Sequence, residues 1–109
     1  MIPSQMLKGM LEGCILKIIQ QKETYAYEIS KQLETYGFGT ISEGTIYPII
    51  LRLQKNEVIT AVARESNSGP KRKYYYLTDK GKTTLQEFEV NWHELDSAVN
   101  QLLEEKSYE

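Results

Sequence analysis

Apolar residues recur every three or four positions between residues 5 and 21, which is the spacing of one face of an amphipathic helix. The apolar positions are Leu7, Met10, Leu11, Cys14, Ile15, Ile18 and Ile19. This pattern predicts one continuous first helix. A second helix is predicted over residues 25–36, with Thr24 as its N-cap and Gly37 as the residue that ends it.

A third amphipathic segment follows Ser42, whose short hydroxyl side chain is typical of a helix N-cap. The positions predicted to face inward are Ile46, Ile49, Ile50 and Leu53, and those predicted to face outward are Gly44, Tyr47, Leu51, Gln54 and Lys55. Pro48 lacks the amide hydrogen that would bond to the carbonyl of residue 44. Because that residue is glycine and leaves space for the ring, we expect a bend at Pro48 rather than the end of the helix.

A β-hairpin is predicted after the third helix. Residues 58–65 (VITAVARE) alternate weakly between apolar and polar, and residues 71–78 (KRKYYYLT) are rich in strand formers. The sequence SNSGP between them is typical of a turn, which we place at Gly69–Pro70. A helix, a hairpin and a cationic strand in this order indicate a winged helix-turn-helix. The predicted fold class is therefore mainly α with a small β-hairpin.

A long last helix is predicted from Asp79 to about Glu105, with Thr78 as its N-cap. Its apolar positions are spaced 3, 4, 3, 4 and 3 residues apart, as in a heptad seam, and are Leu85, Phe88, Trp92, Leu95, Val99 and Leu102. A helix this long extends beyond a small domain, so its seam needs a partner, and a second copy of the chain is the simplest one. We therefore divide the chain into a DNA-binding winged helix-turn-helix, residues 1–78, and a C-terminal dimerisation helix and tail, residues 79–109.

The net charge of −2 is an average over two unlike parts. Residues 1–84 contain twelve basic and eight acidic residues, a net charge of +4, whereas residues 85–109 contain seven acids and one lysine, a net charge of −6. The positive field therefore belongs to the helix–hairpin part, which favours a nucleic-acid partner for that part.

Two sets of residues are candidates for binding DNA. Hydroxyls of Ser42, Thr45 and Tyr47 lie at the start of the third helix, where a helix entering the major groove meets base edges and phosphates. The cations Lys71, Arg72 and Lys73 precede three tyrosines on the predicted strand. An alternative interpretation is that these cations keep an edge strand from aggregating. Tyr25 and Tyr27 open the second helix and carry hydroxyls that can donate to phosphates, although we expect at least one of them to lie in the core. Of the two, Tyr25 is the seventh DNA-binding candidate.

Trp92, at a seam position, has two interpretations: it is interface core, or it stacks on a flat apolar ligand between two subunits. Asp96 follows one helical turn later, where its carboxylate would face a cationic ligand. Gly9 and Gly13 lie four residues apart in the first predicted helix, and each costs ~1 kcal/mol relative to alanine in a helix interior. That cost indicates a close approach to this face, either by a helix or by a small molecule.

The composition argues against an enzyme or a metalloprotein. One cysteine and one histidine cannot assemble a zinc site, and we predict no metal and no cofactor. His93 and Glu94 are not a catalytic pair, because neighbours in a helix point about 100° apart. Cys14 is expected to be a small buried hydrophobe. No segment approaches the ~20 apolar residues of a membrane span or has the pattern of a secretory leader, so a cytoplasmic location is expected.

Four segments together carry a family resemblance: LEGCILKII, YAYEI, EGTIYPIILRL, and GPKRKYYYLT followed by Asp-Lys-Gly. With them the chain resembles the PadR family of bacterial transcriptional regulators, and specifically its short, multidrug-responsive branch. The resemblance implies a winged helix with a C-terminal dimerisation helix that binds a palindromic operator as a homodimer. The DNA-facing motif of the family falls on the six positions Ser42, Thr45, Tyr47, Lys71, Arg72 and Lys73.

The resemblance to the multidrug-responsive branch also implies that Trp92, followed by Asp96, belongs to a drug-stacking helix. Phe88 departs from that pattern, because its bulk one turn before Trp92 would fill a pore that is otherwise open. The interpretation is a homodimeric, sequence-specific transcriptional repressor, with release by a planar hydrophobic ligand at the dimer interface as a hypothesis. The alternative is a protein-interaction module of winged-helix fold without sequence-specific DNA readout.

Overall fold

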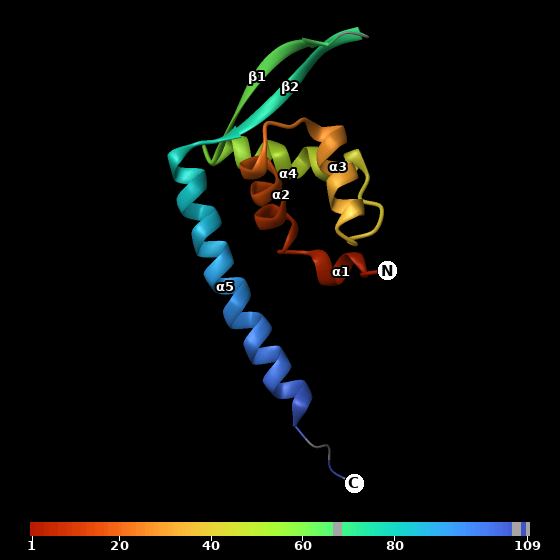
Figure 1. The fold of residues 1–109 in the computed structure, drawn as a ribbon, viewed down its shortest axis with the longest axis vertical. Helices are drawn as coiled ribbons and strands as arrows, with labels where there is room; N and C mark the ends of the chain where they lie inside the picture. The colour runs from red at the N-terminus through yellow and green to blue at the C-terminus, as the bar shows by residue number, and fades with distance from the viewer. Residues whose placement is uncertain (67–68, 106–107, 109) are drawn as a thin grey trace.

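The structure, a computed structural model, describes residues 1–66, 69–105 and 108. The elements are α1 (Ser4–Leu7), α2 (Leu11–Gln21), α3 (Ala26–Thr35), α4 (Glu43–Lys55), β1 (Ile59–Ser66), β2 (Gly69–Leu77) and α5 (Asp79–Glu104). The first four helices form a body from which the hairpin rises at one end, while α5 extends in the opposite direction (Figure 1). This arrangement confirms the predicted fold class of a winged helix-turn-helix with a long C-terminal helix.

The prediction of one continuous first helix is wrong. The chain forms the short α1, leaves the helix at Lys8, and starts α2 at Leu11. Gly9 between them has a φ of +90°, in the left-handed region that glycine adopts without steric cost. Apolar spacing continues across this break, which is why periodicity alone did not reveal it. Gly9 is therefore a turn residue and does not share a helix face with Gly13.

The prediction of Thr24 as the N-cap of the second helix is also wrong. Tyr25 takes the N-cap position and makes no side-chain cap, whereas Thr24 is fully buried. The Thr24 carbonyl accepts a hydrogen bond from the backbone N–H of Tyr75 (2.8 Å), which makes an isolated antiparallel bridge to β2. The Thr24 hydroxyl donates to Glu28 Oε1 (2.9 Å). A β-branched residue suits this extended, strand-like position better than a cap.

The third helix, α4, has the predicted cap, the predicted inward face and the predicted continuation past Pro48. Ser42 is its N-cap and accepts a hydrogen bond from the backbone N–H of Thr45 (3.3 Å). The helix continues through Pro48 to Lys55. The four residues predicted to face inward are all buried. The most deeply buried hydrophobic residues of the core, at most 1% exposed, are Ile15, Leu16, Ile29, Leu33, Ile46, Ile50 and Leu85.

The hairpin pairs β1 with β2 in antiparallel register from Ile59 opposite Leu77 to Arg64 opposite Arg72. Gly69 and Pro70 belong to β2, so the turn predicted at these two residues is wrong in its position. Residues 67–68, which connect the strands, lie outside the described residues. Proline is compatible with the beginning of an edge strand, where its missing N–H costs no ladder bond. Tyr75 turns into the core and anchors the hairpin to the body.

Helix α5 begins in the body and then leaves it. Thr78 caps it, as predicted, by accepting a hydrogen bond from the backbone N–H of Gly81 (3.0 Å). Gly81 and Leu85 are buried, and Phe88 packs against the core cluster. Beyond Phe88 no described residue of α5 packs against the core cluster, although Glu89 still pairs with Lys17 of α2 (3.5 Å), and Figure 1 shows the rest of the helix projecting from the body. Within the part of the chain that the structure describes, no helix has the length and hydropathy required to cross a membrane.

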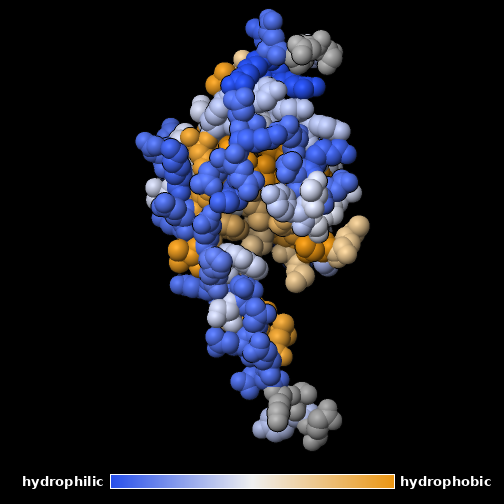
Figure 2. Space-filling view, viewed as in Figure 1, coloured by the Kyte–Doolittle hydropathy of each residue, from blue (hydrophilic) through white to orange (hydrophobic). Residues whose placement is uncertain are grey.

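The outer part of α5 is amphipathic. Figure 2 shows hydrophobic residues gathered on one side of this rod and hydrophilic residues on the other. The seam positions Trp92, Leu95, Val99 and Leu102 are 40%, 51%, 43% and 73% exposed, respectively. Large apolar side chains arranged in a row on a helix that is not packed against the body are typical of an interaction surface.

Candidate nucleic-acid interface

A groove on the surface lies where α3, α4 and β2 meet. Helix α3 contributes its first residues, helix α4 contributes its outward face, and strand β2 contributes its cationic segment. The lining residues are Tyr25, Ala26, Tyr27, Glu43, Tyr47, Ile50, Leu51, Gln54, Lys71, Arg72, Lys73 and Tyr75. The groove thus brings together five of the seven residues that the sequence predicts for DNA binding, from segments up to 48 positions apart (Tyr25 to Lys73).

The cations of this groove are available to an anion. No acid within the described residues forms an ion pair with Lys71, Arg72 or Lys73. The guanidinium of Arg72 lies 4.6 Å from the ring centroid of Tyr25, which supports it in a cation–π contact. Such contacts leave the N–H groups free at the edges of the guanidinium plane, so Arg72 can still bind a phosphate.

Tyr25 has a different position from the one expected of a simple phosphate donor. Its ring meets the edge of Tyr74 at 5.3 Å between centroids and carries Arg72 on its face. Tyr25 therefore acts mainly as an aromatic support for β2. The expectation that Tyr25 or Tyr27 lies in the core is wrong: Tyr25 is half-buried and Tyr27 is exposed, and both line the groove.

Ser42 and Thr45 are not in this groove. They line a second depression, between α1, α2 and α4, together with Gly9 and Arg52. The Ser42 hydroxyl already accepts the cap hydrogen bond and lies 3.2 Å from the Thr45 hydroxyl oxygen. At the start of α4, Glu43 and Tyr47 line the groove together with the β2 cations instead.

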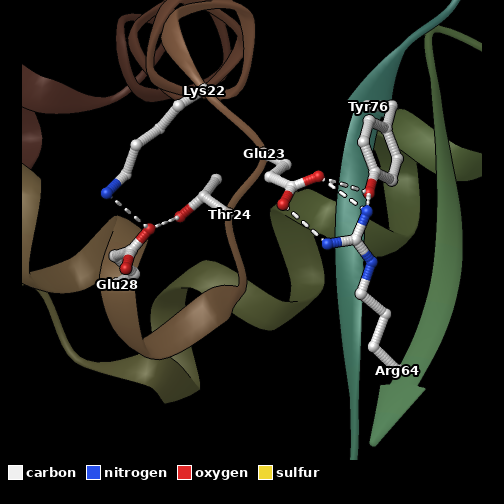
Figure 3. A network of polar contacts seen from close by, with 6 residues as sticks. All are labelled: Lys22, Glu23, Thr24, Glu28, Arg64 and Tyr76. Carbon is white, nitrogen blue, oxygen red and sulfur yellow. Dashed lines mark hydrogen bonds and ion pairs between the residues drawn. The ribbon is translucent and has the colours of Figure 1, made fainter.

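The sequence reasoning missed a polar network between the α2–α3 loop and the hairpin (Figure 3). Glu23 accepts two hydrogen bonds from the guanidinium of Arg64 and a third from the hydroxyl of Tyr76. The hydrogen bonds from Arg64 are the main reason why the pKa of Glu23 is lowered, and the same contacts raise the pKa of Arg64. Glu23 and Arg64 are 41 positions apart, so no local pattern could have paired them.

The residues predicted for ligand binding do not form one site within a single chain. A Cβ added to Gly13 would overlap the ring of Phe88, so the close approach predicted at Gly13 comes from helix α5. Gly9 lies in the turn before α2, and a Cβ there would meet nothing within 4 Å. Trp92 and Asp96 lie on the projecting part of α5, where Asp96 accepts a hydrogen bond from the Asn100 side chain (3.0 Å). A shared site would require a second subunit.

Cys14 is half-buried against the core, close to its predicted role as a small hydrophobe. Burial raises the pKa of its thiol. A thiol with a raised pKa is less ionised near neutral pH, so Cys14 is a poor nucleophile and a packing residue.

The fold and the groove match known regulators. Residues 15–87 match the family model of the transcriptional regulator PadR-like family. A PadR-like transcriptional regulator from Bacillus cereus strain ATCC 14579 is 52% identical over 94% of this chain and 99% of its own, with a TM-score of 0.85. A transcriptional regulator from Streptococcus is 43% identical over 92% of this chain and 98% of its own, with a TM-score of 0.81.

A third structure, PadR of Bacillus subtilis in complex with operator DNA, is 25% identical over 75% of this chain and 48% of its own, with a TM-score of 0.68. The matched family is one of regulators and not of enzymes, in agreement with the sequence prediction. The similarities span the body, the hairpin and the beginning of α5, which are the elements that build the groove. The chain belongs to the PadR-like family of DNA-binding transcriptional regulators.

Proposed function

We propose that this regulator is a homodimeric repressor that binds an operator through the groove between α4 and β2. The observation that carries this proposal is the groove itself, in which the exposed face of a helix lies beside three cations that no described acid neutralises. Helices that present their outward face to the major groove read base edges, and flanking cations neutralise phosphates. Operator binding by the PadR of Bacillus subtilis supports the assignment by family relationship.

Dimerisation is assigned to residues 79–109, and DNA binding to residues 1–78. The exposed row of Trp92, Leu95, Val99 and Leu102 supports this division, because it repeats at heptad spacing beyond the body. Burying one large apolar side chain contributes ~1.5–3 kcal/mol, so two such rows in contact suffice for a stable dimer. A two-fold symmetric protein matches a palindromic operator.

Lys71→Ala and Lys73→Ala test the groove. Each loses one phosphate contact, so the slope of the logarithm of the binding constant against the logarithm of salt concentration should become shallower by about one. A titration with the DNA upstream of the regulator's own gene, at several salt concentrations, measures this slope. Lys17→Ala is the matched control, since Lys17 pairs with Glu89 of α5 and does not line the groove.

Tyr47→Phe provides the contrast within the same experiment. Removal of the hydroxyl from the outward face of α4 should weaken binding to the operator more than binding to random DNA, whereas the lysine variants should weaken binding to both. Unchanged slopes for Lys71→Ala and Lys73→Ala would contradict the proposed interface. They would favour the alternative of a winged-helix protein-interaction module.

Release of the repressor by a planar hydrophobic ligand is the second part of the proposal, and it rests on the resemblance to the multidrug-responsive branch. The favouring observation is that Trp92 remains 40% exposed at the start of the projecting part of α5, one turn before Asp96. In a symmetric dimer two indoles can hold a flat aromatic molecule between them, while the two carboxylates compensate a positive charge. The ring of Phe88 packs on Gly13 of its own chain, which supports an open space beside Trp92 in the proposed dimer.

The fluorescence of Trp92 tests the ligand site, because it is the only tryptophan of the chain. Planar cationic dyes should quench it saturably, and Trp92→Ala should abolish dye binding while leaving the sedimentation coefficient of the dimer unchanged. Asp96→Asn should weaken the binding of cationic dyes more than the binding of neutral dyes of the same shape. Absence of quenching across such a panel, combined with loss of the dimer in Trp92→Ala, would make Trp92 an interface residue only.

A further inference from the structure

We propose that Glu23 is a positioning residue for DNA binding: it fastens the hairpin to the helical body, so that the β2 cations face the same groove as α4. This inference rests on the proposed function, because it concerns how the groove is assembled. Glu23 itself does not line the groove and carries the wrong charge to contact a phosphate.

The geometry of the Glu23 contacts is that of a strong, directional pair. Arg64 Nη1 donates to Glu23 Oε1 at 2.6 Å, and Arg64 Nη2 donates to Oε2 at 2.7 Å. The Tyr76 hydroxyl donates to the same Oε2 at 2.9 Å and accepts a hydrogen bond from Arg64 (Figure 3). A two-pronged guanidinium–carboxylate pair fixes the relative orientation of its partners as well as their distance.

Three consecutive residues of the α2–α3 loop hold three consecutive residues of β2. Glu23 bonds to Tyr76, the Thr24 carbonyl accepts from the backbone N–H of Tyr75, and the ring of Tyr25 meets Tyr74. Lys71, Arg72 and Lys73 follow directly along the strand toward its free end. The direction of this cationic segment is therefore set by the loop contacts at Tyr74–Tyr76.

Charge pairing across the hairpin explains why an acid is needed here. Arg64 lies directly opposite Arg72 in the strand register, and like charges in such a pair destabilise a sheet. The carboxylate of Glu23 neutralises Arg64, and the rings of Tyr74 and Tyr76, 5.0 and 5.8 Å from its guanidinium, hold it in place. Of these two arginines, Arg72 is therefore the one that lines the groove with its charge not neutralised by a described acid.

The positioning role and a purely electrostatic role predict opposite changes in operator affinity when the carboxylate is removed. A carboxylate that only lies on the surface of a DNA-binding domain repels phosphates, so its removal strengthens binding to every DNA. Removal of a carboxylate that positions the hairpin weakens operator binding, although the positive charge of the protein increases. Binding to random DNA depends on charge more than on geometry, so the affinity for random DNA should not fall together with the operator affinity.

Glu23→Gln and Glu28→Gln form a matched pair of variants. Glu28 belongs to the same region and undergoes the same change in charge, but its carboxylate bonds to Thr24 and pairs with Lys22 (3.5 Å), not with the hairpin. We expect Glu23→Gln to lose roughly fivefold in operator affinity, as for one exposed charge-assisted contact, while its affinity for random DNA is unchanged or higher. Glu28→Gln should bind both DNAs at least as well as the wild-type protein.

Arg64→Lys separates geometry from charge. It keeps the cation but loses the two-pronged contact, so operator affinity should fall as in Glu23→Gln, with no change in net charge. If Arg64 instead contacts phosphate directly, Arg64→Lys should bind nearly as well as wild type. That result would overturn the proposal.

Amide hydrogen exchange tests the attachment without DNA. In Glu23→Gln the backbone N–H of Tyr75, which donates to Thr24, should exchange faster, whereas the N–H of Ile29, within α3, should be unchanged. Unchanged exchange at Tyr75, or an increase in operator affinity equal to that of Glu28→Gln, would overturn the role of Glu23. If the wild-type protein bound no DNA at all, the proposed function would fail, and the exchange measurement would still decide whether Glu23 fastens the hairpin.

Discussion

The double variant Leu95→Glu, Val99→Glu should sediment as a folded monomer and lose about a hundredfold or more of the operator affinity. Both residues belong to the exposed row of α5, beyond Phe88, the last described residue of the helix that packs against the core. Two carboxylates on each chain would face two on its partner across an apolar seam, which opposes association strongly. A monomer would bind one half-site only. It would lose the increase in affinity that comes from two linked subunits binding two half-sites together, which is typically 10²–10⁴-fold.

The control for this experiment is His93→Glu with Ser97→Glu, which adds two carboxylates to the same helix. These positions lie together on a different face of α5 from the seam. They should leave both the mass in solution and the operator affinity close to wild type. A double seam variant that remained a dimer would show that α5 does not form the interface. Deleting residues 85–109 is a poorer test, because Leu85 is 1% exposed and its loss opens the core.

Gly81→Ala should destabilise the protein by about 3 kcal/mol or more, at the upper end of the cost of overpacking. An alanine Cβ at this position would overlap the carbonyl oxygen of Val58 and lie 3.0 Å from its carbonyl carbon. A backbone carbonyl cannot rotate away, and this one also accepts a hydrogen bond from the N–H of Thr78 at 3.1 Å. The first turn of α5 would have to shift away from the start of β1.

Thermal unfolding measures this effect, and a loss of that size should lower the melting temperature by more than about 12 °C. Gly69→Ala is the matched control, since a Cβ there would meet nothing within 4 Å and its backbone is not left-handed. It should unfold within a few degrees of the wild-type protein. A Gly81→Ala variant as stable as Gly69→Ala would mean that the junction between the hairpin and α5 adapts at little cost.

Local patterns in the sequence predicted the local structure well. The caps Ser42 and Thr78 were predicted correctly, because a hydroxyl followed by helical residues satisfies a nearby backbone N–H. The inward face of α4 followed from helical spacing. The heptad positions of α5 were predicted as a seam, and one chain leaves four of them exposed. In each case the evidence lies within a few residues of the feature.

The errors concern features that depend on distant residues. Thr24 resembles a cap in its immediate sequence, but pairing with β2 keeps it in an extended conformation. Ser42, Thr45 and Tyr47 are all exposed, but the two hydroxyls line a depression shared with α1 and α2 whereas Tyr47 lines the groove shared with α3 and β2, and this depends on which elements lie beside each side of α4. The partner of Gly13, the ring of Phe88, lies 75 positions away. Spacing along the chain contains no information about such contacts.

The length of α5 has a consequence for how the protein approaches DNA. The molecule is 62 Å long, and Figure 1 places the cationic hairpin at one end and the acidic rod of α5 at the other. Salt screens charges over about 8 Å at physiological ionic strength, so the acids at the far end of α5 barely weaken the attraction at the hairpin. They give the molecule a permanent electric dipole. A duplex close to the outer part of α5 is repelled and one close to the hairpin is attracted, so this charge distribution favours encounters in which the proposed groove faces the DNA.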